Sequence, residues 1–321
     1  MPTPVILDVD TGIDDAMAVM FAARHPEIDL LAISCVTGNT SLENVVANTC
    51  KVLDVVGAPE IPVAGGALRP LLAEPRDASF VHGEDGMGGV ELPESARRPV
   101  PEHAVEMLRR VLTEAEQPVT LVALAPLTNI ALLLRMYPHV AGKIGRILFM
   151  GGSASVGNAT AVAEFNIWHD PEAARIVLNS GVPMTMYGLD VFNTVAVDEA
   201  TIRRLIAAEG AAARALGGLL GFRMHDVADG EQPSSLIGDA GAVCALVAPH
   251  LMQTRRHPVQ VSTEGITRGQ TVVDRRWRAG EDEVHGLAAR WPEIDVVLAA
   301  DIPAVVELFL DAVEGADAGG A

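Results

Sequence analysis

The stretch that most constrains this chain is residues 5–18, where a short apolar run leads directly into a cluster of carboxylates. Four acidic groups fall within eight residues, namely Asp8, Asp10, Asp14 and Asp15. At the end of a buried strand such groups repel and desolvate one another unless a cation or hydrogen-bond donors offset the charge. Because all the ligand atoms on offer are oxygens, the sequence predicts a site for Ca²⁺ or Mg²⁺ rather than Zn²⁺.

The same stretch predicts a strand, a tight turn at a glycine and a helix. Residues 5–9 have the apolar pattern of a buried parallel strand, and an amphipathic helix is expected to begin at Asp14 or Asp15. Asp8 and Asp10 then share one strand face, while the later pair occupies the first helical turn, where the helix dipole favours negative charge. Helix capping explains one or two of these aspartates but not four.

The composition favours one large domain. With 321 residues and 49% hydrophobic side chains, the chain can bury a large core, and no change in composition marks a linker. We expect a single domain over residues 1–321, with residues 315–321 as a disordered tail. A net charge of -19 argues against binding to nucleic acid or to an anionic membrane, because phosphate binding needs clustered Lys and Arg.

The expected location is a reducing cytoplasm. No apolar run reaches the roughly 20 residues of a spanning helix, and no charged segment with a following apolar run opens the chain. The three cysteines, Cys35, Cys50 and Cys244, have no metal-type spacing.

Strand-like runs alternate with helical ones along most of the chain. After the first strand, further buried strands are predicted at residues 28–36, 119–124, 144–150, 182–187 and 294–299. This alternation is typical of an α/β fold with a mainly parallel, open, Rossmann-like sheet flanked by helices. Ligands of such sheets bind beside the carboxyl ends of the strands, so polar residues just after the strands are candidate site residues.

Two polar segments follow predicted strands. Asn39 comes after the second strand, where an amide can orient a polar ligand, although by residue type alone an ordinary turn is the commoner role. Asn158, Glu164 and Asn166 lie in a glycine-rich segment after the strand at 144–150. An extended backbone would turn Glu164 and Asn166 to the same side, so these polar groups are expected to converge on one ligand.

Several motifs resemble blocks of the inosine-uridine preferring nucleoside hydrolase family. They are DxDTGxDDAxA (residues 8–18), the Gly-Asn pair (38–39), HGxDGxG (82–88), ALAPLTNIA (123–131) and GNATAVAEFN (157–166). The similarity spans roughly residues 4–312, with only 190–235 and 274–292 poorly matched. Linked motifs over that length make an accidental similarity improbable.

The resemblance implies an enzyme that cleaves ribonucleosides to ribose and free base, using water activated by a tightly bound Ca²⁺. It implies metal ligands from the side chains of Asp10, Asp15 and Asp239 and from the backbone carbonyl of Leu124. Asp8 is expected to support these ligands without binding the metal itself. Metal coordination lowers the pKa of water, so Asp10 is expected to accept the water's proton as general base.

The resemblance also implies where the substrate binds. Five side chains are expected to hold the ribose hydroxyls: Asp14, Asn39, Asn158, Glu164 and Asn166. His82 and His225 are candidates for contact with the base or proton transfer to it. A lone loop histidine is more often solvated, but the setting of His82 is similar to a family loop that lies over the active site. A homodimer or homotetramer is the expected assembly.

One position departs from the family pattern and keeps two alternatives open. Gly238 stands where many members have a histidine thought to protonate the leaving base. A catalytically weakened, Ca²⁺-dependent sugar- or nucleoside-binding protein is therefore one alternative. A haloacid-dehalogenase-type phosphatase is the other, because residues 8–11 contain two alternating aspartates and a threonine similar to those of its DxDxT motif, with Asp8 as nucleophile. Lys143 is available for phosphate, but no convincing acidic pair follows it.

Overall fold

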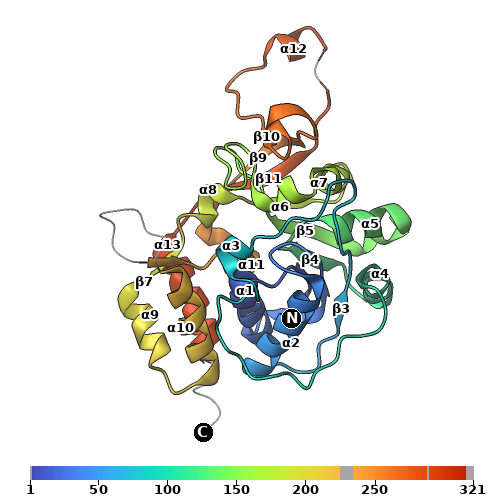
Figure 1. Ribbon diagram of the computed structural model, residues 1–321. Coiled ribbons are helices and arrows are strands. Elements are labelled where there is room, and N and C mark those ends of the chain that lie inside the picture. The colour runs from blue at the N-terminus through green and yellow to red at the C-terminus, as the bar shows by residue number, and fades with distance from the viewer. Residues whose placement is uncertain (1, 225–233, 288, 316–321) are drawn as a thin grey trace.

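The chain folds around one nine-stranded sheet in the computed structural model, which describes residues 2–224, 234–287 and 289–315 (Figure 1). The strand order is β10-β9-β11-β6-β5-β4-β1-β2-β3. Every pair from β11 to β3 is parallel, whereas β9 runs antiparallel to both β10 and β11. The predicted α/β fold with a mainly parallel sheet is therefore confirmed.

The elements alternate along the chain as the sequence predicts. The strands of the large sheet are β1 (Thr3–Val9), β2 (Ile28–Cys35), β3 (Val63–Gly65), β4 (Val119–Ala123), β5 (Ile144–Met150), β6 (Met184–Tyr187), β9 (Met252–Val261), β10 (Thr271–Val273) and β11 (Glu293–Ala300). A small antiparallel pair is formed by β7 (Ala196–Asp198) and β8 (Ser234–Leu236). The α-helices are α1 (Ile13–Arg24), α2 (Leu42–Val55), α3 (Ser79–His82), α4 (Ala104–Glu114), α5 (Thr128–Met136), α6 (Phe165–His169), α7 (Pro171–Leu178), α8 (Leu189–Phe192), α9 (Glu199–Ile206), α10 (Ala211–Arg223), α11 (Ala240–Val247), α12 (Glu281–Val284) and α13 (Ile302–Gly315). Short 3₁₀ helices are η1 (Pro138–Lys143), η2 (Pro249–Leu251) and η3 (Gly265–Thr267).

Helices cover both faces of the sheet, so the central strands are buried throughout (Figure 1). On β1, Val5, Leu7 and Val9 belong to the core formed with α1, α2, α10, α11 and α13. Ile6 points to the opposite face, into the core formed with α4, α5 and α7. Burial on both faces explains why this strand is a near-continuous apolar run rather than an alternating pattern.

The carboxyl ends of the central strands are tied together by buried polar groups. The N–H of Leu124 donates to the carbonyl of Asp8 at 2.8 Å, which extends the β1–β4 pairing beyond β4. The side-chain amide of Asn129, in the first turn of α5, donates to Asp8 Oδ1 at 2.9 Å and to the carbonyl of Cys35 at 3.0 Å. The segments after β1, β2 and β4 therefore meet at one edge of the sheet.

Three local predictions are wrong. Residues 165 and 166 are helical rather than extended, because the Glu164 side chain accepts hydrogen bonds from the N–H groups of Asn166 and Ile167 and so caps α6. His82 is not in an irregular loop but ends the short helix α3. The sequence also predicts helical material from residue 197 to about residue 224, but Val197 lies in β7 because it pairs with β8.

The C-terminal helix and the surface complete the fold. Helix α13 continues through Gly315, one residue into the predicted tail, and residues 316–321 lie outside the described part.

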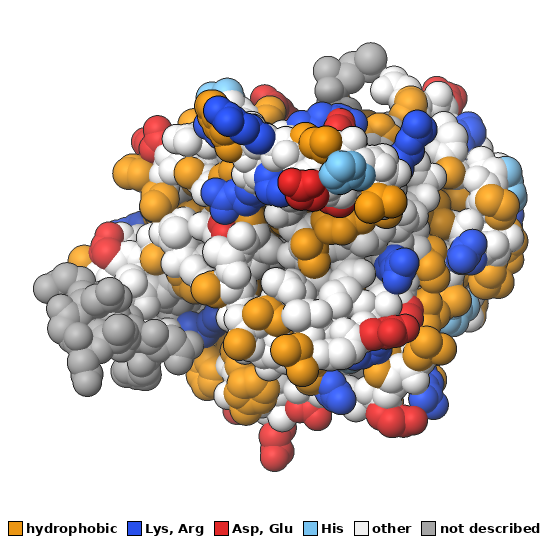
Figure 2. All heavy atoms as spheres, turned by 90° about the horizontal axis from the view of Figure 1, so that it is seen from above, with side chains coloured by type: hydrophobic (Ala, Val, Ile, Leu, Met, Phe, Trp, Pro, Cys, Tyr) orange, Lys and Arg blue, Asp and Glu red, His pale blue; other side chains and the backbone are white. Residues whose placement is uncertain are grey.

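Every helix among the described residues is too short or too polar to cross a membrane. On the face shown in Figure 2, described acidic, basic and hydrophobic side chains are interspersed. The single-domain assignment stays a prediction.

Candidate active site

The acidic turn between β1 and α1 is closed largely by its own backbone. The Asp15 carboxylate accepts hydrogen bonds from the N–H groups of Asp10 at 3.2 Å and Gly12 at 3.1 Å. The side-chain amide of Asn39, which follows β2, donates to the same carboxylate at 3.0 Å. Burial, followed by the charge of Asp14, still raises the pKa of Asp15 to about 7. Three donors thus offset only part of the charge in this turn.

Asp10 is held just as firmly. Its Oδ2 accepts the backbone N–H of Asn39 at 2.8 Å, and its Oδ1 accepts the Asn39 side-chain amide at 3.2 Å. Burial, followed by the charge of Asp15, raises the pKa of Asp10 well above its ordinary value. A buried carboxyl with a raised pKa suits the predicted role of general base, although that role stays a prediction.

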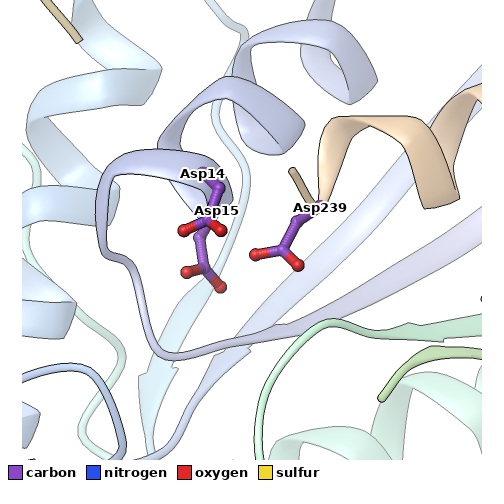
Figure 3. Close-up of side chains that lie close together, drawn as sticks. All are labelled: Asp14, Asp15 and Asp239. Carbon is purple, nitrogen blue, oxygen red and sulfur yellow. The ribbon is translucent and has the colours of Figure 1, made fainter. Parts of the chain in front are cut away.

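Asp239, at the start of α11, faces the acidic turn (Figure 3). One carboxylate oxygen from each of Asp14, Asp15 and Asp239 lies within 4.8 Å of the others, and all three side chains are buried. Burial, followed by the charges of Asp14 and Asp15, raises the pKa of Asp239 well above its ordinary value. Asp14 Oδ1 is buried and has no hydrogen-bond partner among the residues that the structure describes. This all-oxygen set fits a hard divalent cation, so the cluster is able to hold a metal.

The cluster differs in membership from the predicted ligand set. Within the described residues it contains Asp14, which the sequence predicts as a ribose ligand, and not Asp10, whose two oxygens both accept hydrogen bonds from Asn39. The carbonyl of Leu124 accepts a hydrogen bond from the side-chain amide of Asn166 at 2.7 Å. The full ligand set therefore stays a prediction.

A cavity of about 140 Å³ adjoins this cluster. The charged and polar side chains lining it belong to Asp14, Asn39, His82, Asn158, Glu164, Asn166, Arg223 and Asp239. The aromatic rings of Phe80, Phe165 and Phe192 form part of its wall. A larger groove of about 800 Å³ runs beside α5 and α7, but it is lined by none of the predicted site residues that the structure describes. The smaller cavity is therefore the candidate site.

The polar segment after β5 reaches the cavity through buried hydrogen bonds. Glu164 accepts the N–H groups of Gly152 at 2.9 Å and of Asn166 at 2.8 Å, and burial raises its pKa to about 7. The Asn166 amide also donates to the carbonyl of Met150 at 3.2 Å. Asn158 Oδ1 accepts a backbone N–H at 2.9 Å. These three residues therefore line one cavity, held by a helix cap rather than by an extended strand, and their convergence on one ligand stays a prediction.

His82 is enclosed rather than solvated. Its side chain is only 6% exposed, and Nδ1 accepts the N–H of Ile13 at 3.2 Å, next to Asp14 Oδ1 at 3.7 Å. Burial lowers the pKa of His82, against the opposing charge of Asp14. The neutral imidazole therefore keeps Nε2 as its N–H donor. The other candidate, His225, lies outside the described residues.

Arg223 lies in the polar segment before Ser234, where the resemblance places the family's base-selecting residues, but the sequence gives it no role of its own. It ends α10, and its Nη1 lies 3.3 Å from Asp14 Oδ2, with side-chain exposures of 12% and 9%. The two residues are 209 positions apart, so no local spacing could reveal the pair. The signal for Arg223 in the sequence is that a basic residue lies in the polar segment before Gly238. Position 238 is the one at which this chain lacks the family's histidine.

The position of Asp8 does not favour the phosphatase alternative. Its Oδ1 accepts hydrogen bonds from the Ser34 hydroxyl at 2.5 Å and the Asn129 amide at 2.9 Å, and burial raises its pKa to about 7. Asp8 thus braces the strand ends, and its hydrogen bonds to Ser34 and Asn129 account for its burial without a nucleophilic role.

Fold and site together define an α/β protein with a small polar cavity beside a buried acidic cluster of metal-ligand type. The family described as inosine-uridine preferring nucleoside hydrolase matches residues 5–307. The chain belongs to this family, as its motifs predict. It is therefore a nucleoside hydrolase, an enzyme that cleaves the N-glycosidic bond of ribonucleosides, and neither alternative is favoured.

Individual relatives cover nearly the whole chain. The pyrimidine-specific ribonucleoside hydrolase RihA of Photobacterium profundum is 44% identical over 279 residues, which span 86% of this chain and 90% of that protein. The solved structure of the plant nucleoside hydrolase PpNRh1 has a TM-score of 0.88 at 30% identity, with 98% and 99% of the two chains covered. The purine-preferring ribonucleoside hydrolase from Gardnerella vaginalis has a TM-score of 0.87 at 30% identity, with 98% of each chain covered.

Gly238 is a position that excludes a side chain, and we expect Gly238→Ala to destabilise the protein more than Gly57→Ala. Both glycines have positive φ, +56° and +64°, but an added Cβ would lie 2.4 Å from Asp14 Cβ at Gly238 and meet nothing within 4 Å at Gly57. Urea unfolding should show that the free energy of unfolding falls by about 1–2 kcal/mol in Gly57→Ala and by roughly 2–5 kcal/mol in Gly238→Ala. Equal losses would contradict the close contact with Asp14.

The raised carboxyl pKa values make stability and cation binding depend on pH. The pKa of Asp15 rises from 3.8 to about 7, so between these values the metal-free folded state binds more protons than the unfolded state. Its stability therefore falls as the pH rises through this window. A divalent cation needs the deprotonated carboxylates, so CaCl₂ or MgCl₂ should raise the melting temperature more at about pH 8 than at about pH 6. An increase that is the same at both pH values would count against the cluster as the binding site.

Proposed function

We propose that this nucleoside hydrolase acts on pyrimidine ribonucleosides and uses Ca²⁺ as its metal. The observation that carries the proposal is the buried cluster of the Asp14, Asp15 and Asp239 carboxylates, two of which, Asp14 and Asp239, line the same cavity as Glu164 and Asn166. The RihA relative, at 44% identity, is named as pyrimidine-specific, whereas the relative named as purine-preferring is 30% identical. The higher identity supports a pyrimidine substrate.

The proposed Ca²⁺ ligands are the side chains of Asp10, Asp15 and Asp239 and the carbonyl of Leu124. These protein oxygens do not fill the roughly six to eight positions that Ca²⁺ accepts, so water and substrate can complete the set. When bound, the ion supplies a water of lowered pKa and binds ribose hydroxyls. Asp8 supports the set indirectly, through its hydrogen bonds to Ser34 and Asn129.

Asp10 is the proposed general base. The backbone and side chain of Asn39 fix both of its oxygens, which orients the carboxylate before substrate arrives. Cleavage of the N-glycosidic bond builds positive charge at C1′, so buried carboxylates around the ribose favour the transition state over the ground state. The proposed ribose ligands are Asp14, Asn39, Asn158, Glu164 and Asn166.

The histidines are proposed to act on the base. His82 lines the cavity and has an occupied Nδ1, so it offers a hydrogen bond from Nε2 rather than a ready proton. His225, outside the described residues, is proposed for the same role. If the His82→Ala and His225→Ala variants both cleave uridine at the wild-type rate, the proposed roles of these two histidines are wrong.

The activity test compares Asp10→Asn with Asp29→Asn on uridine, cytidine and inosine. Asp29 is an exposed residue of β2 and serves as the matched control. Asp10→Asn should lower kcat on uridine by roughly 10²–10⁴-fold, the usual value of a general base, while Asp29→Asn changes nothing. Ribose release should be faster from uridine or cytidine than from inosine. Asp10→Asn with a near-normal rate would remove the base role, and faster cleavage of inosine would contradict the pyrimidine preference.

The proposed assembly is a homodimer or homotetramer. The segment with α12 projects from the body of the protein (Figure 1). Large apolar residues are exposed before and within it, Ile266 in η3 at 99% and Trp277 between β10 and α12 at 92%. Light scattering should give two or four times the 33.7 kDa chain mass. Trp277→Glu should lower that mass, whereas Ile206→Glu, on α9, should not. A 33.7 kDa particle for the wild type would refute the assembly.

The proposed location is the cytoplasm. Cys35, Cys50 and Cys244 are buried free thiols, which suits a reducing compartment. Cell fractionation that recovers the protein outside the cytoplasm would overturn this location.

A further inference from the structure

The departing base needs a partner for its negative charge, and the residue before Asp239 supplies none. Gly238 has no side chain, and its surroundings exclude one, because an added Cβ would lie 2.4 Å from Asp14 Cβ and 2.8 Å from Asp14 Oδ2. The close packing of residue 238 against Asp14 in the acidic turn therefore leaves no room for a side chain at this position. Another group must meet the base on this side of the cavity.

Arg223 brings a cation to that side. Its Nη1 lies 3.3 Å from Asp14 Oδ2, the same oxygen that blocks a side chain at Gly238. Arg223 also lines the cavity, with its side chain 12% exposed. The guanidinium thus borders the space left by Gly238, close to where a base joined to a ribose at Asp14 would extend.

We propose that Arg223 binds and stabilises the departing pyrimidine, an inference that rests on the proposed pyrimidine ribonucleoside hydrolase function. The water oxygen bonds to C1′ and its proton passes to a protein carboxylate, while the C1′–N1 bond breaks and its electron pair goes to the base. The resulting charge spreads over N1 and the O2 oxygen of the pyrimidine. A guanidinium keeps its protons, so it stabilises this anion by charge and N–H donation, and the base takes a proton from solvent after release.

Arg223 suits this role better than the enclosed imidazole. His82 uses Nδ1 to accept the N–H of Ile13 at 3.2 Å, so it has a single ring N–H left for the base. A guanidinium is a planar fork with five N–H donors and a permanent charge, so it is better suited than a neutral imidazole to an oxygen that gains negative charge. The competing role for Arg223 is only to hold Asp14 in place, and the two roles differ in their dependence on the leaving group.

The test compares uridine with p-nitrophenyl riboside, whose phenolate departs without help. Wild type is assayed beside Arg223→Gln, Arg223→Lys and the control Arg214→Gln, an exposed arginine of the same helix. Arg223→Gln should lower kcat on uridine by roughly 10²–10³-fold and change kcat on p-nitrophenyl riboside by less than about 3-fold. Arg223→Lys should fall between wild type and Arg223→Gln, and Arg214→Gln should match wild type. Circular dichroism checks that each variant is folded.

Other outcomes overturn the assignment in distinguishable ways. An equal loss on both substrates would show that Arg223 only positions Asp14. No loss on uridine would show that the base leaves without Arg223. A wild type that cleaves p-nitrophenyl riboside but not uridine would show that Arg223 does not support a pyrimidine leaving group. A wild type that cleaves neither would refute the proposed function itself, together with this inference.

Discussion

The site depends on keeping several carboxylates buried within a few ångströms of one another. The chain meets this constraint first with its own backbone, because the N–H groups of Asp10 and Gly12 both point at Asp15 and the N–H of Asn39 points at Asp10. These donors are fixed by the strand-turn-helix path, so they act before any ligand arrives. They do not remove the repulsion, since the pKa of Asp15 is still raised to about 7. Folding and cation binding are therefore coupled through the same carboxylates.

The parallel sheet makes this crowding possible by bringing separate strand ends to one edge. Asn129 shows how tightly the edge is held. Its amide N–H groups bond to Asp8 and Cys35, and its Oδ1 accepts the N–H of Ala67 at 2.9 Å. One buried side chain thus ties the ends of β1 and β2 to the segment after β3. A displacement of any of these segments would move Asp10 or Asn39, so the geometry of the site is a property of the sheet edge as a whole.

The sequence reveals the parts of this site that are local in the chain. The acidic turn was predictable because residues 8–15 carry both the apolar strand pattern and the carboxylates. Glu164 was predictable as a site residue, but not in its geometry, because capping of α6 depends on the backbone rather than on residue alternation. The Arg223–Asp14 pair joins residues 209 positions apart, and only the packing of α10 beside α1 brings them together. Long-range pairs of this kind leave no periodic signal.

Asp14 connects the two halves of the chemistry. One of its oxygens lies 3.7 Å from His82 and the other 3.3 Å from Arg223, while the same carboxylate belongs to the acidic cluster. A cation bound at the cluster would be neutralised in part by the Asp14 carboxylate, so this carboxylate would offset less of the charge of Arg223. The attraction of Arg223 for an anionic base would then be stronger. The metal side and the base side are thus electrostatically linked through one residue. Because Arg223 keeps its charge, it acts on the base differently from an acid that gives up a proton. It favours leaving groups that place negative charge on a hydrogen-bonding oxygen, as a pyrimidine does at O2.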